Sequence, residues 1–155
     1  KWDYEEYKKV FDVNLNGVVY GLEFLTPVMM DQGDGIIAGI GSLADGRGFP
    51  GSAPYSASKI AAAYMLESAR VELKKHGIRV VTVRPGFVKS NITAKNKFHM
   101  PFLMEADKAA KVIANGIKRG KRVISFPLPM ALVTRLVRAL PNFLYDLAMK
   151  NWKAE

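Results

Sequence analysis

Tyr55 and Lys59 are the two residues whose types and spacing point most directly to chemistry. They lie four residues apart in a segment with a helical pattern, so both side chains project from the same helix face. A phenol has a pKa of about 10 and exchanges protons poorly at neutral pH. An adjacent ammonium group favours the phenolate and lowers that pKa. The pair therefore predicts a general acid or base, although Tyr-x-x-x-Lys alone is a common and weak pattern.

Two further groups are expected near this pair because of where the predicted strands end. Ser42 follows a short apolar run at residues 36–40, and Pro85-Gly86 follows a β-branched run at residues 78–83. Ligands of an open parallel sheet bind outside the carboxyl ends of its strands. Ser42, the start of the Tyr55 helix and Pro85-Gly86 are therefore expected to converge on one crevice. A hydroxyl there could donate a hydrogen bond to a substrate oxygen on which negative charge develops.

The segments that position these residues alternate between helical and strand patterns. Helices are predicted at residues 3–30, 55–75, 105–118 and 130–152, and a third strand at 122–126. This alternation predicts an α/β fold, namely the C-terminal part of a doubly wound, Rossmann-like parallel sheet with flanking helices. Three strands make an incomplete sheet, so residues 1–155 are expected to form a partial single domain. Residues 130–152, interrupted at Pro141, form an amphipathic helical tail.

Four segments, in this order and spacing, resemble the motifs of the short-chain dehydrogenase/reductase family. Residues 12–17 (DVNLNG) resemble its Asn-bearing helix segment, and residues 41–44 (GSLA) and 55–59 (YSASK) its active-site stretch. Residues 83–90 (VRPGFVKS) resemble its Pro-Gly motif. The resemblance covers roughly residues 1–125 and is specific because all four motifs agree.

This resemblance implies roles for four catalytic residues. Tyr55 would donate or accept the proton, and Lys59 would assist it and hold the nicotinamide ribose hydroxyls. Ser42 would orient and polarise the substrate oxygen. Asn14 would shape its helix so that a water molecule connects Lys59 to solvent. The alternative for Asn14 is an ordinary polar position on a helix.

The resemblance also implies NAD or NADP as cofactor, with Tyr55, Lys59 and residues of the Pro-Gly motif in contact with it: Pro85, Gly86, Val88 and Ser90. The family's glycine-rich pyrophosphate-binding turn does not occur in this sequence, so we expect the nucleotide-binding half to precede Lys1 and this chain alone to be inactive. Gly41 stands where the family often has Ser, Asp45 where it often has Gly, and Ser90 where it usually has Thr. These departures are expected to affect the loop more than the chemistry.

Composition and charge argue against nucleic-acid binding, metal binding and a membrane-spanning segment. The net charge of +9 arises from scattered basic pairs, and no nucleic-acid-binding motif accompanies it. The sequence has no cysteine, and His76 and His99 lie far apart, so no metal site is predicted. It has no secretory signal pattern and no apolar run of transmembrane length, which favours a cytoplasmic location.

The apolar segments of the sequence bear on the substrate and on the partners of the protein. Residues 91–104 are rich in apolar side chains and would either contact an apolar substrate or pack on the sheet. The helices at 4–30 and 55–75 are apolar on every side, so we expect a homodimer or homotetramer through them, with small Ala61, Ala62 and Ala63 allowing close approach. The tail either packs on protein or makes peripheral contact with a membrane. A catalytically silent binding or scaffold protein is the alternative to an active oxidoreductase.

Overall fold

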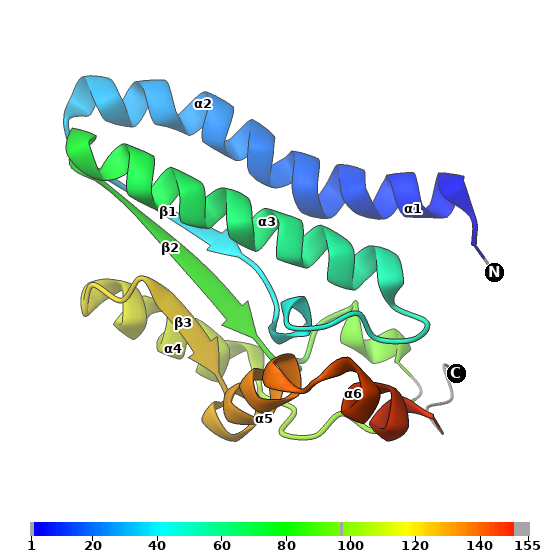
Figure 1. Cartoon of the computed structure of the whole chain (residues 1–155). Helices are drawn as coiled ribbons and strands as arrows, with labels where there is room; N and C mark the ends of the chain where they lie inside the picture. Colours follow the sequence, from blue (N-terminus) through cyan, green and yellow to red (C-terminus); the bar gives the residue numbers. More distant parts are fainter. Residues whose placement is uncertain (1, 97, 151–155) are drawn as a thin grey trace.

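The computed structural model describes residues 2–96 and 98–150. Its centre is a sheet of three parallel strands in the order β1 (Gly35–Ile40), β2 (Ile78–Pro85) and β3 (Val123–Phe126). Gly35 lies opposite Ile78, and Thr82 lies opposite Val123. Helices cover both faces of the sheet (Figure 1). The predicted α/β class and all three predicted strands are confirmed.

One face of the sheet is covered by the first half of the chain. Helix α1 (Tyr4–Phe11) continues through a π-helical segment, η1 (Asp12–Asn16), into α2 (Gly17–Gln32). Helix α3 (Ala53–Glu72) ends in a 3₁₀ turn, η3 (Leu73–His76). Helix α2 packs on β1 and α3 on β2, with α2 and α3 side by side (Figure 1). The predicted helix at residues 3–30 is therefore confirmed, although its π-helical segment was not predicted.

The second half of the chain covers the opposite face and the carboxyl ends of the strands. Helix α4 (Ala106–Lys118) packs on β2 and β3. Helices α5 (Leu128–Ala139) and α6 (Asn142–Met149) lie below the strand ends and are separated at Pro141, as predicted (Figure 1). Two 3₁₀ turns, η2 (Leu43–Asp45) and η4 (Thr93–Lys95), interrupt the loops after β1 and β2. The tail beyond residue 150 lies outside the described residues.

Strand β2 holds the two layers together because both of its faces are buried. Ile78 and Val80 point to the α2–α3 side, where they pack with Ile37, Leu66 and Leu73. Val81 and Val83 point to the α4 side, where they pack with Ala109, Ile124 and Phe126. A strand buried on both faces explains why residues 78–83 form a nearly continuous apolar run in the sequence.

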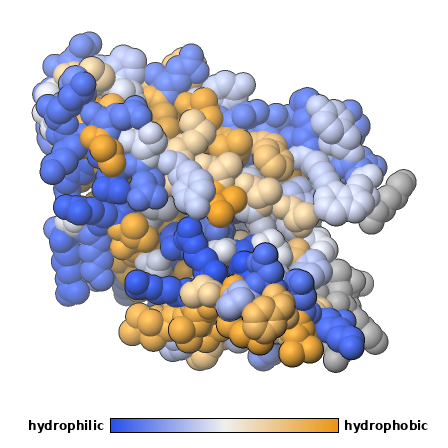
Figure 2. All heavy atoms as spheres, in the orientation of Figure 1, coloured by the Kyte–Doolittle hydropathy of each residue, from blue (hydrophilic) through white to orange (hydrophobic). Residues whose placement is uncertain are grey.

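The outer surface of α2 and α3 remains strongly apolar. Phe24 is 71% exposed, and Tyr20, Val28, Tyr64 and Met65 also face outward. Figure 2 shows hydrophobic side chains over α2 and α3 and a second group over α5 and α6. Ala62 is 0% exposed, so the expectation that this alanine faces a second copy is wrong. None of the described helices has the length and apolar character needed to cross a membrane.

Candidate active site

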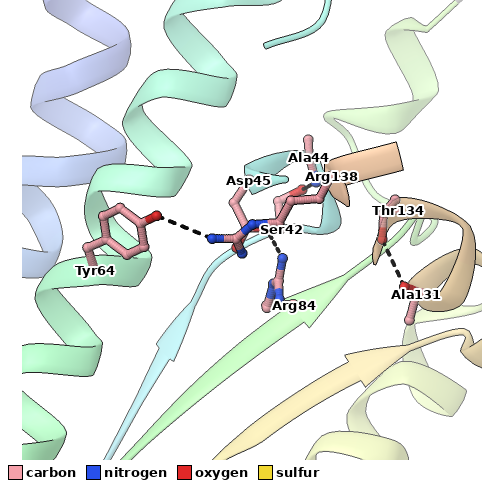
Figure 3. Close-up of polar contacts among 8 residues, drawn as sticks. All are labelled: Ser42, Ala44, Asp45, Tyr64, Arg84, Ala131, Thr134 and Arg138. Atoms are coloured by element: carbon pink, nitrogen blue, oxygen red, sulfur yellow. Dashed lines mark hydrogen bonds and ion pairs between the residues drawn. The ribbon is translucent and has the colours of Figure 1, made fainter. Parts of the chain in front are cut away.

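Ser42 lies immediately beyond the carboxyl end of β1, as the strand pattern predicted. Its side chain is buried, and its Oγ accepts a hydrogen bond from the backbone N–H of Ala44 at 3.1 Å (Figure 3). A hydroxyl carries one donor and two acceptor positions. Because the Ala44 contact uses an acceptor position, the Ser42 proton remains available to a group in front of the strand ends.

Tyr55 and Lys59 lie in the first two turns of α3, with Pro54 in the opening turn. The phenol ring of Tyr55 is 40% exposed, and the Lys59 Nζ lies 5.8 Å from the ring centroid. The Lys59 Nζ also donates to the carbonyl oxygen of Ile40 at 3.2 Å. Since Ile40 ends β1, this bond ties the Tyr55 helix to the strand that leads into Ser42. Burial lowers the pKa of the Lys59 ammonium.

Asn14 supports this helix from the π-helical segment η1. Its Nδ2 donates to the Oγ of Ser58 at 3.1 Å, and that hydroxyl donates to the carbonyl oxygen of Tyr55 at 2.9 Å. Ser58 is fully buried between the two helices. Isolated π-helical turns occur frequently at functional sites because they redirect one side chain. Asn14 is therefore connected to the turn that carries Tyr55 and Lys59, and its described hydrogen bond goes to Ser58 rather than to Lys59.

Pro85 and Gly86 lie at the carboxyl end of β2, beside the loop that contains Ser42. The Gly86 N–H donates to the carbonyl oxygen of Phe126 at 2.7 Å. A Cβ at Gly86 would lie 2.6 Å from the Sδ of Met130 and 3.5 Å from a methyl carbon of Leu43. A side chain at this position would therefore require Met130 to move.

Val88 and Ser90 lie further along the same loop, where Val88 packs against the core and Ser90 is exposed. Val88 pairs with Met104 in an isolated parallel bridge, which closes the base of the 91–104 segment. The backbone N–H of Ser90 donates to the Oγ1 of Thr93 at 2.9 Å, and the Thr93 hydroxyl donates to the Val88 carbonyl at 2.8 Å. The structure thus bonds Lys59 to Ile40, two residues before Ser42, brings Leu43 beside Gly86, and places Ser90 in a separate turn.

Asp45 was expected to matter only for the loop, yet it is one of the most buried polar residues. It is 3% exposed, and its carboxylate is ion-paired with the guanidinium of Arg84 (Figure 3). Burial raises the pKa of Asp45, and the charge and hydrogen bond of Arg84 oppose that rise. Arg138 of α5 lies beside this pair and donates to the Tyr64 hydroxyl of α3 at 3.2 Å.

A second arginine attaches the same loop to the C-terminal helices. Arg47 donates to the carbonyl oxygen of Leu140 at 3.0 Å and to the Oδ1 of Asn142 at 3.3 Å. Its guanidinium lies 4.3 Å from the centroid of the Tyr145 ring, and the Tyr145 hydroxyl donates to the Gly48 carbonyl at 2.7 Å. The loop between Ser42 and Tyr55 is therefore held on both sides by polar contacts that local sequence patterns did not reveal.

Comparison with known proteins identifies the family of the chain. A family model described as short chain dehydrogenase matches residues 1–100. An uncharacterized oxidoreductase of Myxococcus xanthus is 42% identical over 148 residues, which cover 96% of this chain and 58% of that protein. Human 17-beta-hydroxysteroid dehydrogenase 13 is 30% identical over 141 residues, covering 89% of this chain and 47% of that protein. The chain therefore belongs to the short chain dehydrogenase family and spans about half the length of these relatives.

A solved structure extends the agreement to the fold. A short chain dehydrogenase from Burkholderia cenocepacia, described in complex with NADP, superimposes with a TM-score of 0.81 at 24% identity. The superposition covers 94% of this chain and 60% of that protein. The three strands and their helices thus correspond to a portion of a larger Rossmann-like sheet.

Proposed function

We propose that this chain is the catalytic part of an NAD(P)-dependent oxidoreductase that interconverts a carbonyl group and an alcohol. The observation that supports the proposal is the hydrogen bond from Lys59 to Ile40, which holds the helical turn of Tyr55 at the end of β1, two residues before Ser42. A bound nicotinamide would supply or accept the hydride. The same position outside the strand ends is where ligands of open α/β sheets bind.

Each side chain has a separate task in this proposal. The Ser42 hydroxyl donates to the substrate oxygen and stabilises the negative charge that develops there. Tyr55 transfers the proton to or from that oxygen, and its exposed ring leaves the phenol accessible to a ligand. The Lys59 ammonium places a positive charge beside the phenol. Asn14 holds the helical turn of both residues through Ser58.

The residues present fit the nicotinamide end of the cofactor. A lysine ammonium has three N–H bonds. Within the described residues the Lys59 ammonium hydrogen-bonds only to the Ile40 carbonyl, which leaves donors for ribose hydroxyls. Gly86 follows the end of β2 and packs against Met130 and Leu43, which brings its backbone beside the loop that carries Ser42. The sequence contains no glycine-rich turn of the kind that binds a pyrophosphate, so the residues present fit only the nicotinamide end.

The substrate is proposed to be apolar. Phe98, Phe102 and Leu103 are exposed on the loop that follows the Pro-Gly motif. Phe98 contacts Phe87 edge to face, with ring centroids 5.8 Å apart, so the loop presents aromatic surface next to the strand ends. The name of the human relative refers to a hydroxysteroid, which is an apolar alcohol.

Substitution of Tyr55 tests this function. In the full-length enzyme, Tyr55→Phe should lower kcat by about 10²- to 10⁴-fold, since proton transfer is lost while the ring is kept. Turnover would be measured with NADH and NADPH on a panel of apolar ketones, and cofactor affinity by fluorescence titration. Tyr4→Phe, an exposed tyrosine on α1, is the matched control and should retain full turnover. Near-normal turnover of Tyr55→Phe would refute the proposal.

A further inference from the structure

Two positions at which this sequence departs from its family's pattern meet the same side chain. Arg84, the residue before Pro85, is ion-paired with the buried carboxylate of Asp45. A Cβ at Gly41 would lie 3.8 Å from the Cγ of Arg84 and 3.1 Å from the carbonyl oxygen of Val83. The Arg84 side chain therefore passes next to Gly41 before its guanidinium reaches Asp45. Gly41 thus lies beside the start of the Arg84 side chain, and Asp45 binds its guanidinium.

Ser42 lies between these two ends. On one side the Gly41 N–H donates to the Val83 carbonyl oxygen at 2.7 Å. On the other side the backbone N–H of Asp45 donates to the carbonyl oxygen of Ser42 at 3.3 Å, which closes the 3₁₀ turn η2. Gly41 is thus bonded directly to β2, and Asp45 is held on β2 through its ion pair with Arg84, next to the Pro85-Gly86 turn.

A second cation from the C-terminal half completes the cluster. Arg138 of α5 acts electrostatically on Asp45, and its guanidinium donates to the hydroxyl of Tyr64 on α3. Figure 3 shows the Arg138 and Arg84 side chains meeting at Asp45, close to Ser42, with Tyr64 reaching in from α3. The carboxylate of Asp45 thus pairs the β1 loop with β2, and Arg138 of α5 lies beside this pair and is hydrogen-bonded to α3.

We propose that Asp45, Arg84 and Arg138 are positioning residues that fix the Ser42 hydroxyl relative to the Pro85-Gly86 turn. This inference rests on the proposed function, in which those two elements hold the substrate oxygen and the nicotinamide. Hydride transfer requires the reacting atoms to approach to about 3–3.5 Å, and an error of about 1 Å costs on the order of 100-fold in rate. Removing one partner of a buried ion pair leaves an uncompensated charge, so the surrounding loop must rearrange.

The test uses substitutions that change charge or donor geometry but little volume. In the full-length enzyme, Asp45→Asn should lower kcat by about 10- to 100-fold, with cofactor affinity and KM altered less than about threefold. Arg84→Lys keeps the positive charge without the planar fork and should lower kcat by about tenfold. Arg138→Gln should have a smaller effect, since its partner contact is exposed. The control is Glu67→Gln, which breaks the exposed Arg70 pair on α3 and should leave kcat unchanged.

A purely structural role must be separated from positioning. The rate is therefore expressed per cofactor-binding site, and thermal unfolding is followed on the same samples. A kcat per site that stays at the wild-type value in Asp45→Asn would overturn the inference, whatever the change in stability. If Asp45→Asn does not fold, Arg84→Lys decides by the same criterion. Tyr55→Phe is measured in parallel. If this variant turns over at the wild-type rate, the proposed function is refuted, and this inference with it.

Discussion

The carboxyl ends of the strands and the outer surface of α2 and α3 are organised in opposite ways. At the strand ends, several buried polar groups are paired: Asp45 with Arg84, Ser58 with Asn14, and the Ser42 Oγ with the Ala44 N–H. Within the described residues, Arg84 Nε and Ser56 Oγ are buried there without a hydrogen-bond partner. On the outer surface, large apolar side chains such as Phe24 and Val28 are exposed. A groove of about 480 Å³ runs between these helices, lined by Leu22, Thr26, Tyr64, Met65, Ser68, Ala69, Glu72 and Leu73.

The difference shows which groups find their partners within this chain and which surface is left for another protein segment. Burying a polar group without a partner costs more than burying an apolar one, so the strand ends are organised within the chain. A contiguous exposed apolar patch instead marks a surface that another protein segment covers. Strand β1 has the same character, because among the described strands only β2 pairs with it, and Ile36 and Ile40 are exposed on the face opposite Ile37. We therefore propose that catalysis depends on residues within this chain, and that stability depends on contacts beyond it.

The largest expected effect tests the first part of this comparison. Ser42→Ala should lower kcat by about 10²- to 10³-fold, because it removes the donor to the substrate oxygen. The molecular mass in light scattering and the thermal unfolding temperature should change little, since the Ser42 Oγ has a single local contact with Ala44. Loss of turnover together with dissociation of the assembly would show that the two regions are not independent.

A second prediction concerns assembly through α2 and α3. Phe24→Glu should roughly halve the molecular mass of the full-length protein in solution, because it places a charge within the proposed helix–helix contact between two copies. Leu136→Glu is a matched control on α5: the two side chains are 71% and 69% exposed, so neither substitution disturbs the core. Light scattering at micromolar concentration measures both. A fall in mass for Leu136→Glu alone would assign assembly to the tail instead.

The contrast between the two regions also explains what the sequence could predict. The three strands, the long helices and the Ser42, Tyr55 and Lys59 cluster follow from local periodicity and from the rule that parallel strands end at one edge of the sheet. Asp45 could not be assigned in this way, because its burial depends on arginines that lie far from it in sequence. A carboxylate in a glycine-rich loop is ordinarily solvated, and only the fold shows that Arg84 points toward it.

The same limit applies to Asn14 and Ala62. The sequence placed Asn14 on a helix, but the π-helical turn and the bond to Ser58 depend on packing between η1 and α3. Ala62 lies in a run of seven apolar residues that has no clear polar side, so the pattern alone did not determine which alanine faces the interior. Periodicity identifies an element reliably, and identifies its buried face only where polar residues mark the other face.

A third, smaller effect is expected on α5 and α6, whose apolar side chains form the lower strip in Figure 2. Leu132, Leu136, Phe143 and Leu147 are exposed there, with Arg135 and Lys150 on the same helices. If this strip makes peripheral contact with a membrane, the full-length protein should sediment with vesicles containing an anionic phospholipid, and less with neutral ones. Leu136→Glu should reduce the bound fraction, whereas Phe24→Glu should not. Equal sedimentation of Leu136→Glu and the wild type would exclude the strip as the contact.

The smallest expected effect concerns the charge of Lys59, which lies at the boundary between the two regions. Burial lowers the pKa of this ammonium below 10.5, so between the lowered pKa and 10.5 the unfolded chain binds more protons than the folded one. The free energy of unfolding of the wild type, relative to Lys59→Met, should therefore rise as the pH increases through that interval. Lys8 is the matched control, since its contact with Asp12 raises its pKa and its stabilising contribution is lost only above 10.5. Denaturant unfolding between about pH 8 and pH 10.5 should give a rising difference for Lys59→Met and a constant one for Lys8→Met. A constant difference for both variants would mean that Lys59 is as well solvated as a surface lysine, and that the strand ends are more open to water than the buried Asp45 and Ser58 suggest.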